Sequence, residues 1–237
     1  MHGWRGRIGL IVPSSNTTME PELTAAAPEG VSVHTARMRL REVTVEGLLE
    51  MEEHAEEAAL QLSDARVDVI VYGCTTGSLV KGPGHDTQLS RRLSSIASCP
   101  VVATATAVVQ ALKAVGASSI AVATPYIEEL DRREKEFLEA SGFRVVEMRG
   151  LGIRDNTEIG KLPPHVAYQL AKEVDSPEAH AVFISCTNFR TFEVIEKLER
   201  DLGKPVVTSN QASLWAALKH LKIREVKLQL GTLMQLL

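Results

Sequence analysis

The chain has 237 residues, of which 44% are hydrophobic and 24% charged, and its formal net charge at pH 7 is -4. These proportions are typical of a globular protein, and a chain of this length buries roughly 70–75% of its unfolded surface. An acidic balance with 4% aromatic residues argues against nucleic acid as a partner. Because the sequence has no bilayer-length apolar segment and no secretory apolar region near its basic start, we expect a cytoplasmic protein without a membrane partner.

The first half of the chain alternates strand patterns with helical patterns. Between the second and third strands, apolar residues at helical spacing predict one helix over Glu46–Arg66, with its acidic residues, Glu52 among them, on the solvent side. Short Val- and Ile-rich runs that end in polar residues or glycine predict four strands, at Ile8–Val12, Val31–Thr35, Val67–Tyr72 and Val101–Thr104.

The second half repeats this order. Its predicted strands are Ile120–Thr124, Arg144–Met148, Ala181–Ser185 and Val206–Thr208. Its predicted helices are Glu128–Ser141, His165–Val174, Arg190–Leu202 and Gln211–Leu221. Alternation throughout favours parallel sheets covered by helices. The apolar C-terminal segment KLQLGTLMQLL is expected to pack on a neighbouring lobe or subunit, which suggests a homo-oligomer.

Three pairs of landmarks recur at nearly the same interval, as they do in a duplicated chain. The sequence therefore predicts an α/β protein of two pseudo-symmetric lobes, over residues 1–116 and 117–237. Each lobe is expected to be a parallel four-stranded sheet flanked by helices. The landmark pairs, which lie 110, 112 and 105 residues apart, are Asn16 with Tyr126, Cys74 with Cys186, and Pro100 with Pro205.

Polar turns follow four of the predicted strands, at the edge where open parallel sheets bind ligands. Pseudo-symmetry places Cys74 and Cys186 on opposite walls of one cleft between the lobes. Cys99 has Lys204 at the equivalent position, so we expect it to be structural. The turns are Ser14–Asn16, Cys74–Ser78, Pro125–Tyr126 and Cys186–Asn188.

A cysteine at a helix N-terminus has its pKa lowered below about 8.5 by the helix dipole and the converging N–H groups. We therefore expect Cys74 and Cys186 to be reactive thiols that are alkylated before Cys99. Two thiols facing a planar carbon let one add or abstract on one face while the other transfers a proton on the opposite face. Racemisation, epimerisation and addition–elimination at a double bond all fit this arrangement. The structural alternative is a pair of inert buried thiols.

Five segments together resemble the maleate cis-trans isomerase branch of the aspartate/glutamate racemase superfamily. They are RIGLIVPSSNTTMEPEL, YGCTTGS, TPY, RDNTEIG and ISCTNFR, and the resemblance extends from about Arg7 to Leu221. It implies a two-lobed fold, no metal, no pyridoxal phosphate and a catalytic cysteine in each lobe. It further implies that Cys74 adds to an alkene carbon of maleate while Cys186 protonates the neighbouring carbon. Rotation in the succinyl thioether and elimination would then give fumarate.

The substrate implied by the resemblance is a small carboxylate, with Asn16, Tyr126 and Asn156 holding its carboxylate groups. Hydroxyl, amide and turn N–H donors at the strand ends independently suit such a substrate, since they bind anions without a buried positive charge. Helix capping is the alternative role for the Ser and Thr residues, and turn formation for Asn156. The further candidate binding residues are Ser14, Thr75, Thr76, Thr187 and Asn188.

Other functions stay open at this point. The polar residues after both cysteines also suit an amino-acid racemase with a two-thiol mechanism, whereas Cys74 argues against an arylmalonate-type decarboxylase, which uses one cysteine of the second lobe. Two lobes around a cleft also describe a non-catalytic carboxylate-binding protein. His85 and His165 lack partners at metal-ligand spacing and are expected in exposed loops. No phosphate loop or dinucleotide fingerprint is present, so we expect no cofactor.

Overall fold

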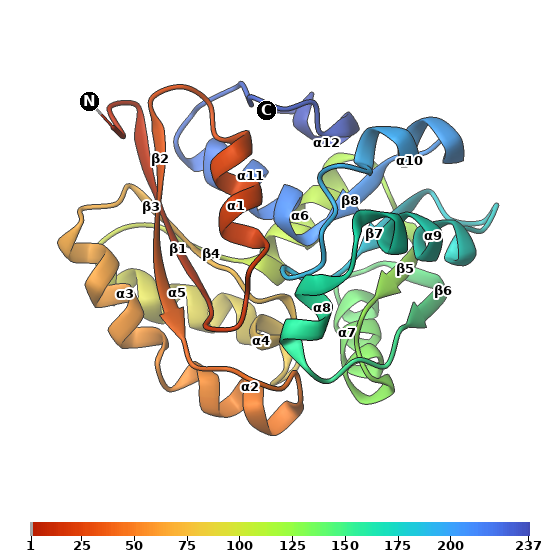
Figure 1. Cartoon of the computed structure of the whole chain (residues 1–237), viewed down its shortest axis with the longest axis horizontal. Coiled ribbons are helices and arrows are strands. Elements are labelled where there is room, and N and C mark those ends of the chain that lie inside the picture. The colour runs from red at the N-terminus through yellow and green to blue at the C-terminus, as the bar shows by residue number, and fades with distance from the viewer. Residues whose placement is uncertain (1) are drawn as a thin grey trace.

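The computed structural model describes residues 2–237 and contains two four-stranded parallel sheets (Figure 1). Adding four to each strand number of the first sheet gives the order of the second, which confirms the duplicated fold that the sequence predicts. The first sheet has the order β2-β1-β3-β4 and consists of β1 (Gly6–Pro13), β2 (Val31–Met38), β3 (Val69–Tyr72) and β4 (Val101–Ala103). The second has the order β6-β5-β7-β8 and consists of β5 (Ser119–Thr124), β6 (Arg144–Gly150), β7 (Ala181–Ile184) and β8 (Val206–Thr208).

Helices connect the strands and cover the sheets, as parallel strands require. Those of the first half are α1 (Met19–Ala26), α2 (Val45–Glu52), α3 (Ala55–Asp64), α4 (Thr75–Leu79), α5 (His85–Ala97) and α6 (Thr104–Ala114). Those of the second half are α7 (Glu128–Ala140), α8 (Asn156–Lys161), α9 (Pro164–Val174), α10 (Ile195–Leu202), α11 (Ser209–His220) and α12 (Gly231–Met234).

Two predicted helices are wrong in their extent. The helix expected over Glu46–Arg66 is divided, because the N–H groups of Glu53 and His54 bond three residues back, at 3.2 and 3.1 Å, and close a tight turn. The helix expected over Arg190–Leu202 begins only at Ile195. The segment before Ile195 is held in turns because the carboxylate of Glu22, on α1, binds two of its backbone N–H groups.

The two halves share their core through α6 and α11, which lie against each other between the sheets (Figure 1). Residues Ser209 to Leu218 of α11 are all buried, and the helix also contacts β3 and β4 of the first sheet. A helix surrounded on all sides by protein has no polar face, which is why its sequence pattern is weakly amphipathic. The division into residues 1–116 and 117–237 stays a prediction from the repeat.

The C-terminal segment packs within its own chain. The Lys227 N–H donates to the Ala26 carbonyl at 2.9 Å, and Leu233 and Met234 are buried where α12 meets α10 and α11. Its buried apolar side chains therefore give no support to a homo-oligomer, which stays a prediction.

In the stretch 2–237, no helix has the length and apolar character that crossing a membrane requires.

Glu52 and His85 contradict the sequence analysis, because both are buried rather than exposed. Glu52 is 4% exposed, and its carboxylate lies 2.9 Å from His85 Nε2, 3.0 Å from Lys81 Nζ and 2.9 Å from Arg92 Nη2. These partners, on and before α5, outweigh the effect of burial and lower the pKa of Glu52 to about 2. His165 is exposed, but it belongs to the first turn of α9 rather than to a loop.

Glu52 should therefore make the protein sensitive to acid. A carboxylate with a depressed pKa contributes stability above pH 4.5 that disappears as the pH falls toward about 2. Breaking a fully buried ion pair costs about 3–5 kcal/mol. Because Lys81 and Arg92 are partly exposed, the cost is smaller here, and we expect Glu52→Gln to lower the free energy of unfolding at pH 7 by about 2–3 kcal/mol.

Urea unfolding between pH 3 and pH 7 measures this effect. The loss of stability on acidification should be smaller in Glu52→Gln than in the unmodified protein. Glu57→Gln, an exposed change on the neighbouring helix α3, is the control and should retain the full pH dependence. An identical acid dependence in all three proteins would contradict the assignment.

Candidate active site

Cys74 lies at the junction between β3 and α4. It is the N-cap residue of α4, and its sulfur accepts a hydrogen bond from the Gly77 N–H at 3.3 Å. A side chain at position 77 would meet this sulfur, since a Cβ there would lie 2.9 Å from Sγ. Glycine at this position therefore lets the first turn of α4 close on the thiol.

Cys186 lies at the equivalent end of β7, in a different backbone conformation. Its φ of 98° is in the left-handed region, which is strained for a residue with a side chain by about 1–3 kcal/mol. The Asn188 N–H donates to its sulfur at 3.4 Å, and its own N–H donates to the Ser209 hydroxyl at 3.1 Å. The turn that contains Cys186 is thus fixed by hydrogen bonds rather than by a helix.

Direct hydrogen bonds tie the two cysteine turns to each other. The Ser209 hydroxyl, which accepts from the Cys186 N–H, also accepts from the Thr75 hydroxyl at 2.9 Å. The Thr187 hydroxyl donates to the Gly73 carbonyl at 3.1 Å. Both thiols are buried, and charge on Cys74 raises the pKa of Cys186. The structure therefore brings the two cysteines of the repeat into one buried site.

The asparagine residues predicted to bind carboxylate gather around these turns. Asn16 Nδ2 donates to the Thr187 hydroxyl at 3.0 Å. Asn156 Nδ2 donates to the Ser15 hydroxyl at 2.8 Å, and Asn188 Nδ2 donates to the Asn156 carbonyl at 2.6 Å. The first two hydrogen bonds connect residues of the two halves of the chain, and the third connects the Cys186 turn to the start of α8. They form one buried, uncharged group of donors next to the thiols.

Tyr126 and Thr76 also lie at the thiols. The Tyr126 hydroxyl forms a hydrogen bond with Cys186 that lowers the thiol pKa, and charges on Cys186 and Cys74 both raise the pKa of Tyr126. This phenol therefore lies within reach of both sulfurs. Thr76, directly after Cys74, hydrogen-bonds the Cys74 thiol and lowers its pKa.

Ser14 is not placed with the other predicted binding residues. It is exposed, and its hydroxyl donates to the Leu40 carbonyl at 3.3 Å and accepts from the Leu40 N–H at 3.1 Å. These bonds fasten the end of β1 to the segment after β2. The neighbouring Ser15 takes the inward position and accepts from Asn156.

The sequence analysis did not identify Ser209, Glu22 or Asn210, although they fix the Cys186 turn. Ser209 could have been found, since the interval between Pro100 and Pro205 places it opposite Thr104 in the repeat. Glu22 carries no such signal. Its carboxylate accepts from the Thr191 N–H at 2.8 Å and from Asn210 Nδ2 at 2.6 Å, and burial raises its pKa to about 7.

The expectation of lowered thiol pKa values is wrong for the ligand-free protein. Burial raises the pKa of Cys74 to about 11 and that of Cys186 to about 12, although hydrogen bonds lower both. Loss of hydration outweighs one or two donors per sulfur. In addition, α4 has 5 residues and no helix starts at Cys186, so the expected helix dipole is weak or absent.

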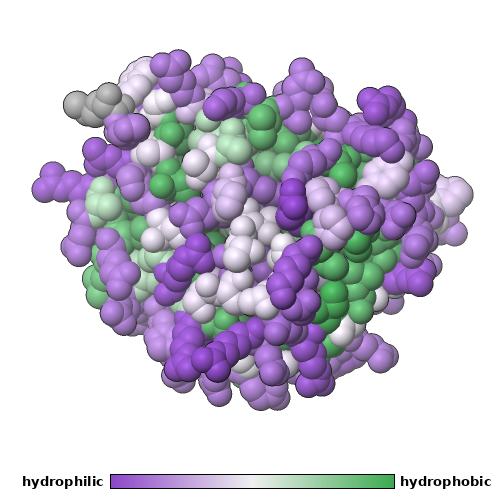
Figure 2. All heavy atoms as spheres, viewed as in Figure 1, coloured by the Kyte–Doolittle hydropathy of each residue, from purple (hydrophilic) through white to green (hydrophobic). Residues whose placement is uncertain are grey.

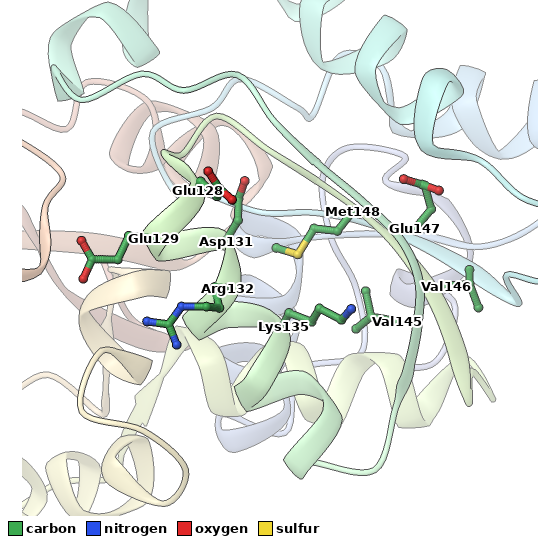
Figure 3. Close-up of a pocket in the computed structure, with 9 residues that line it drawn as sticks. All are labelled: Glu128, Glu129, Asp131, Arg132, Lys135, Val145, Val146, Glu147 and Met148. Carbon is green, nitrogen blue, oxygen red and sulfur yellow. The ribbon is translucent and has the colours of Figure 1, made fainter.

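A hollow of about 680 Å³ lies on the surface between α7 and β6 (Figure 3). Figure 2 shows an apolar patch in this region of an otherwise largely polar face, and Val145, Val146 and Met148 line the hollow there. Arg132 and Lys135 of α7 also line it, but no cysteine does. The hollow is therefore separate from the paired thiols.

Within residues 2–237, no three His, Cys, Asp or Glu side chains are grouped as metal ligands.

Comparisons with known proteins agree with this architecture. The family described as "Arylmalonate decarboxylase" matches residues 8–234. A maleate isomerase from Geobacillus stearothermophilus is 34% identical over 242 residues, with 96% of each chain covered. An arylmalonate decarboxylase from Bordetella bronchiseptica is 26% identical over 214 residues, covering 90% of this chain and 89% of the decarboxylase.

Two solved structures are similar over nearly their whole length. A maleate isomerase variant from Pseudomonas putida, crystallised with maleate, has a TM-score of 0.93 and 31% identity, with 97% of both chains covered. A cysteine-to-serine variant of the Nocardia farcinica maleate cis-trans isomerase, with a covalently bound succinylcysteine intermediate, has a TM-score of 0.93 and 32% identity. That comparison covers 97% of this chain and 98% of the Nocardia chain.

Two duplicated parallel lobes that meet at a pair of buried thiols define a two-cysteine α/β enzyme. The chain belongs to the maleate cis-trans isomerase branch of the aspartate/glutamate racemase superfamily.

The thiol environments reverse the alkylation order expected from the sequence. Cys99 is partly exposed, whereas Cys74 and Cys186 are buried with strongly raised pKa values. We expect iodoacetamide to label Cys99 first in the ligand-free protein at pH 7.5, because reaction needs an accessible thiolate. Peptide mapping against time measures the order. Cys99→Ser is the control and should leave slow labelling of the other two thiols unchanged; fast labelling of Cys74 in either protein would contradict the expectation.

Proposed function

We propose that this protein converts maleate to fumarate by addition and elimination of a cysteine thiol. The observation that carries the proposal is the placement of two thiols from opposite halves in one buried site, joined through Ser209 and Thr75. The relatives named above support it, because they are maleate isomerases and one was captured with a succinylcysteine intermediate.

Two sulfurs are sufficient for the chemistry. Cys74, a neutral thiol in the ligand-free protein, first gives its proton to solvent. The Cys74 thiolate then adds to one alkene carbon, and the thiol proton of Cys186 goes to the neighbouring carbon, which leaves Cys186 as the thiolate. The former double bond, now single, rotates. Cys186 then removes a proton from the same carbon, the carbon–sulfur bond breaks, and its electron pair returns to Cys74. One negative charge therefore moves from one sulfur to the other and back.

Donors are available at both ends of this charge movement. The Gly77 N–H and the Thr76 hydroxyl serve the Cys74 sulfur, and the Asn188 N–H and the Tyr126 hydroxyl serve the Cys186 sulfur. Because these donors are held in place before reaction, they stabilise either thiolate without reorganisation. The charge alternates between two prepared positions in a site from which bulk water is excluded.

We assign the substrate carboxylates to the amides of Asn16, Asn156 and Asn188, with the hydroxyls of Thr75 and Thr187. In the ligand-free protein these donors bond to one another and to neighbouring backbone, so none is left without a partner. A carboxylate oxygen can replace such an internal acceptor. Neutral donors bind a dianion less tightly than arginine would, which suits a product that must leave.

The assigned groups supply every step with protein atoms alone, and we propose a reaction that needs no metal or organic cofactor. A cytoplasmic location and a homo-oligomeric state remain predictions from the sequence. The two-sided thiol pair also suits racemisation of an amino acid, which we treat as the second candidate.

Proton NMR distinguishes these functions. We expect the protein, after dialysis against a chelator, to convert maleate to fumarate in deuterated water. Aspartate, glutamate and arylmalonates should remain unchanged under the same conditions. Exchange of the α-proton of aspartate or glutamate, without reaction of maleate, would favour a racemase; loss of carbon dioxide from an arylmalonate would favour a decarboxylase. Activity that returns only when a metal or pyridoxal phosphate is added would contradict a cofactor-free reaction.

The two cysteines should differ in their ability to form an adduct. With maleate, intact-protein mass spectrometry should find a thioether on Cys74 in Cys186→Ser and none in Cys74→Ser. Both variants should turn over at least about 10²-fold more slowly, the lower end of a general acid–base contribution. Cys99→Ser should retain full activity. An adduct on Cys186 in the Cys74→Ser protein would reverse the roles.

A further inference from the structure

Glu134 is a buried carboxyl that the reaction described above does not use. It lies on α7 with 1% of its surface exposed, and its Oε1 atom is 2.7 Å from the Ser185 hydroxyl. Its other oxygen, Oε2, is buried without a hydrogen-bond partner. Ser185 directly precedes Cys186, so the carboxyl is one side chain away from the reacting turn.

A chain of hydroxyl groups connects Glu134 to the Cys186 sulfur. The Ser185 hydroxyl lies 3.5 Å from the Tyr126 hydroxyl, and the Tyr126 hydroxyl lowers the pKa of the Cys186 thiol, whose pKa burial raises overall. The charge of Glu134 raises the pKa of both Tyr126 and Cys186, which shows that the carboxyl is electrically close to the sulfur. Glu134, Ser185 and Tyr126 therefore form a connected row of side chains, and the last two lie beside Cys186 in sequence or in effect on its pKa.

The groups that face Glu134 favour its neutral form. They are Asp131 on its own helix, Tyr126 after β5 and Cys186 after β7, all of which are neutral or negative. Helix α4, which packs against α7, has no charged side chain, and the cations of α7 form their ion pairs with Glu129, Glu136 and Glu139. Burial and the charge of Asp131 raise the pKa of Glu134 to about 8.

We propose that Glu134 is a positioning residue whose proton orients the Ser185–Tyr126–Cys186 hydrogen-bond chain, so that the Tyr126 hydroxyl donates to the Cys186 thiolate. The inference rests on the proposed function in one respect, because it assigns the thiolate of Cys186 to the step that follows protonation of the substrate. The coupling between Glu134 and Cys186 itself follows from the ligand-free structure.

The direction of the chain depends on a single proton, because a hydroxyl donates only one hydrogen bond. A neutral Glu134 donates to Ser185, which leaves the Ser185 hydrogen for Tyr126 and the Tyr126 hydrogen for the sulfur. An ionised Glu134 instead takes the Ser185 hydrogen for itself. It also places a second negative charge near a site that must hold one on sulfur. No covalent bond changes along the chain; only the hydrogen-bond direction reverses.

The expected consequence is an alkaline limit on activity. As the pH rises through about 8, Glu134 ionises and the Cys186 thiolate becomes less stable, so kcat/KM for maleate should fall. Glu134→Gln retains an N–H donor for Ser185 but cannot ionise, and this fall should be absent from its pH profile. Glu136→Gln, on the exposed side of the same helix, is the matched control and should show the unmodified profile.

A second variant should move the alkaline limit without removing it, because Glu134 can still ionise. The hydrogen bond from Ser185 lowers the pKa of Glu134, so its removal in Ser185→Ala should move the alkaline limit to higher pH. A merely structural role for Glu134 would reduce the rate by the same factor at every pH in both variants. An alkaline limit that stays in place in Glu134→Gln would overturn the proposal.

Labelling kinetics test the coupling without catalysis. The rate at which iodoacetamide labels Cys186, followed by peptide mapping from pH 6.5 to 9.5, reports its thiolate fraction. In the unmodified protein the logarithm of this rate should rise by less than one per pH unit around pH 8, because Glu134 becomes charged. In Glu134→Gln the slope should stay at one, so that the ratio of variant to unmodified rate increases about threefold or more between the ends of the range.

The two readouts separate the proposals. If labelling shows the coupling but maleate is not isomerised, the proposed function fails and the role of Glu134 stands. If maleate is isomerised but the labelling slopes of Glu134→Gln and the unmodified protein are identical, the role of Glu134 is overturned. Thermal unfolding of each variant verifies that the comparison is made on folded protein.

Discussion

The hydrogen bonds of the Ser209 hydroxyl hold the site together. One oxygen atom accepts from the backbone of Cys186 in the second half and from the side chain of Thr75 in the first. Ser209 is the first residue of α11, the buried helix that packs against α6 and both sheets, so this oxygen has little freedom to move. The separation of the two thiols is therefore set by the packing of a buried helix rather than by surface loops.

The presence or absence of a cationic partner explains why similar buried carboxyl groups behave differently in this protein. Glu52 has three nitrogen partners and a pKa of about 2, whereas Glu22 and Glu134 lack a cation and have pKa values of about 7 and 8. The first stabilises the fold as an ion; the other two lie next to the Cys186 turn, where an additional negative charge would oppose a thiolate. Burial also raises the pKa of both cysteines, so both thiols are protonated in the ligand-free protein.

The sequence predicted the features that depend on local pattern or on duplication. Strand periodicity located all eight strands, and the spacing of Cys74 from Cys186 indicated that they would meet, because a repeat fixes both topology and position. Features that depend on distant partners were missed. Nothing in the run of glutamates around Glu52 indicates that Lys81, His85 and Arg92 would turn one of them inward.

The candidate site residues came partly from the polar turns after the strands and partly from the family resemblance, which alone indicated Asn156. Asn16, Thr75, Tyr126, Asn156 and Asn188 were named from motifs and gather around the thiols. Ser14 was named with them, but its hydroxyl is engaged by the backbone of Leu40. Glu134 lies in the middle of a strongly charged helix whose other glutamates are largely exposed, so its burial follows only from the way α7 packs on β6 and α4.

The left-handed backbone of Cys186 sets a conflict between stability and activity at a single position. Glycine would adopt its φ of 98° without strain, because it has no Cβ. Cysteine therefore carries a conformational cost at this point of the turn that glycine would not. A residue chosen for this backbone conformation alone would lack the thiol that the proposed reaction requires.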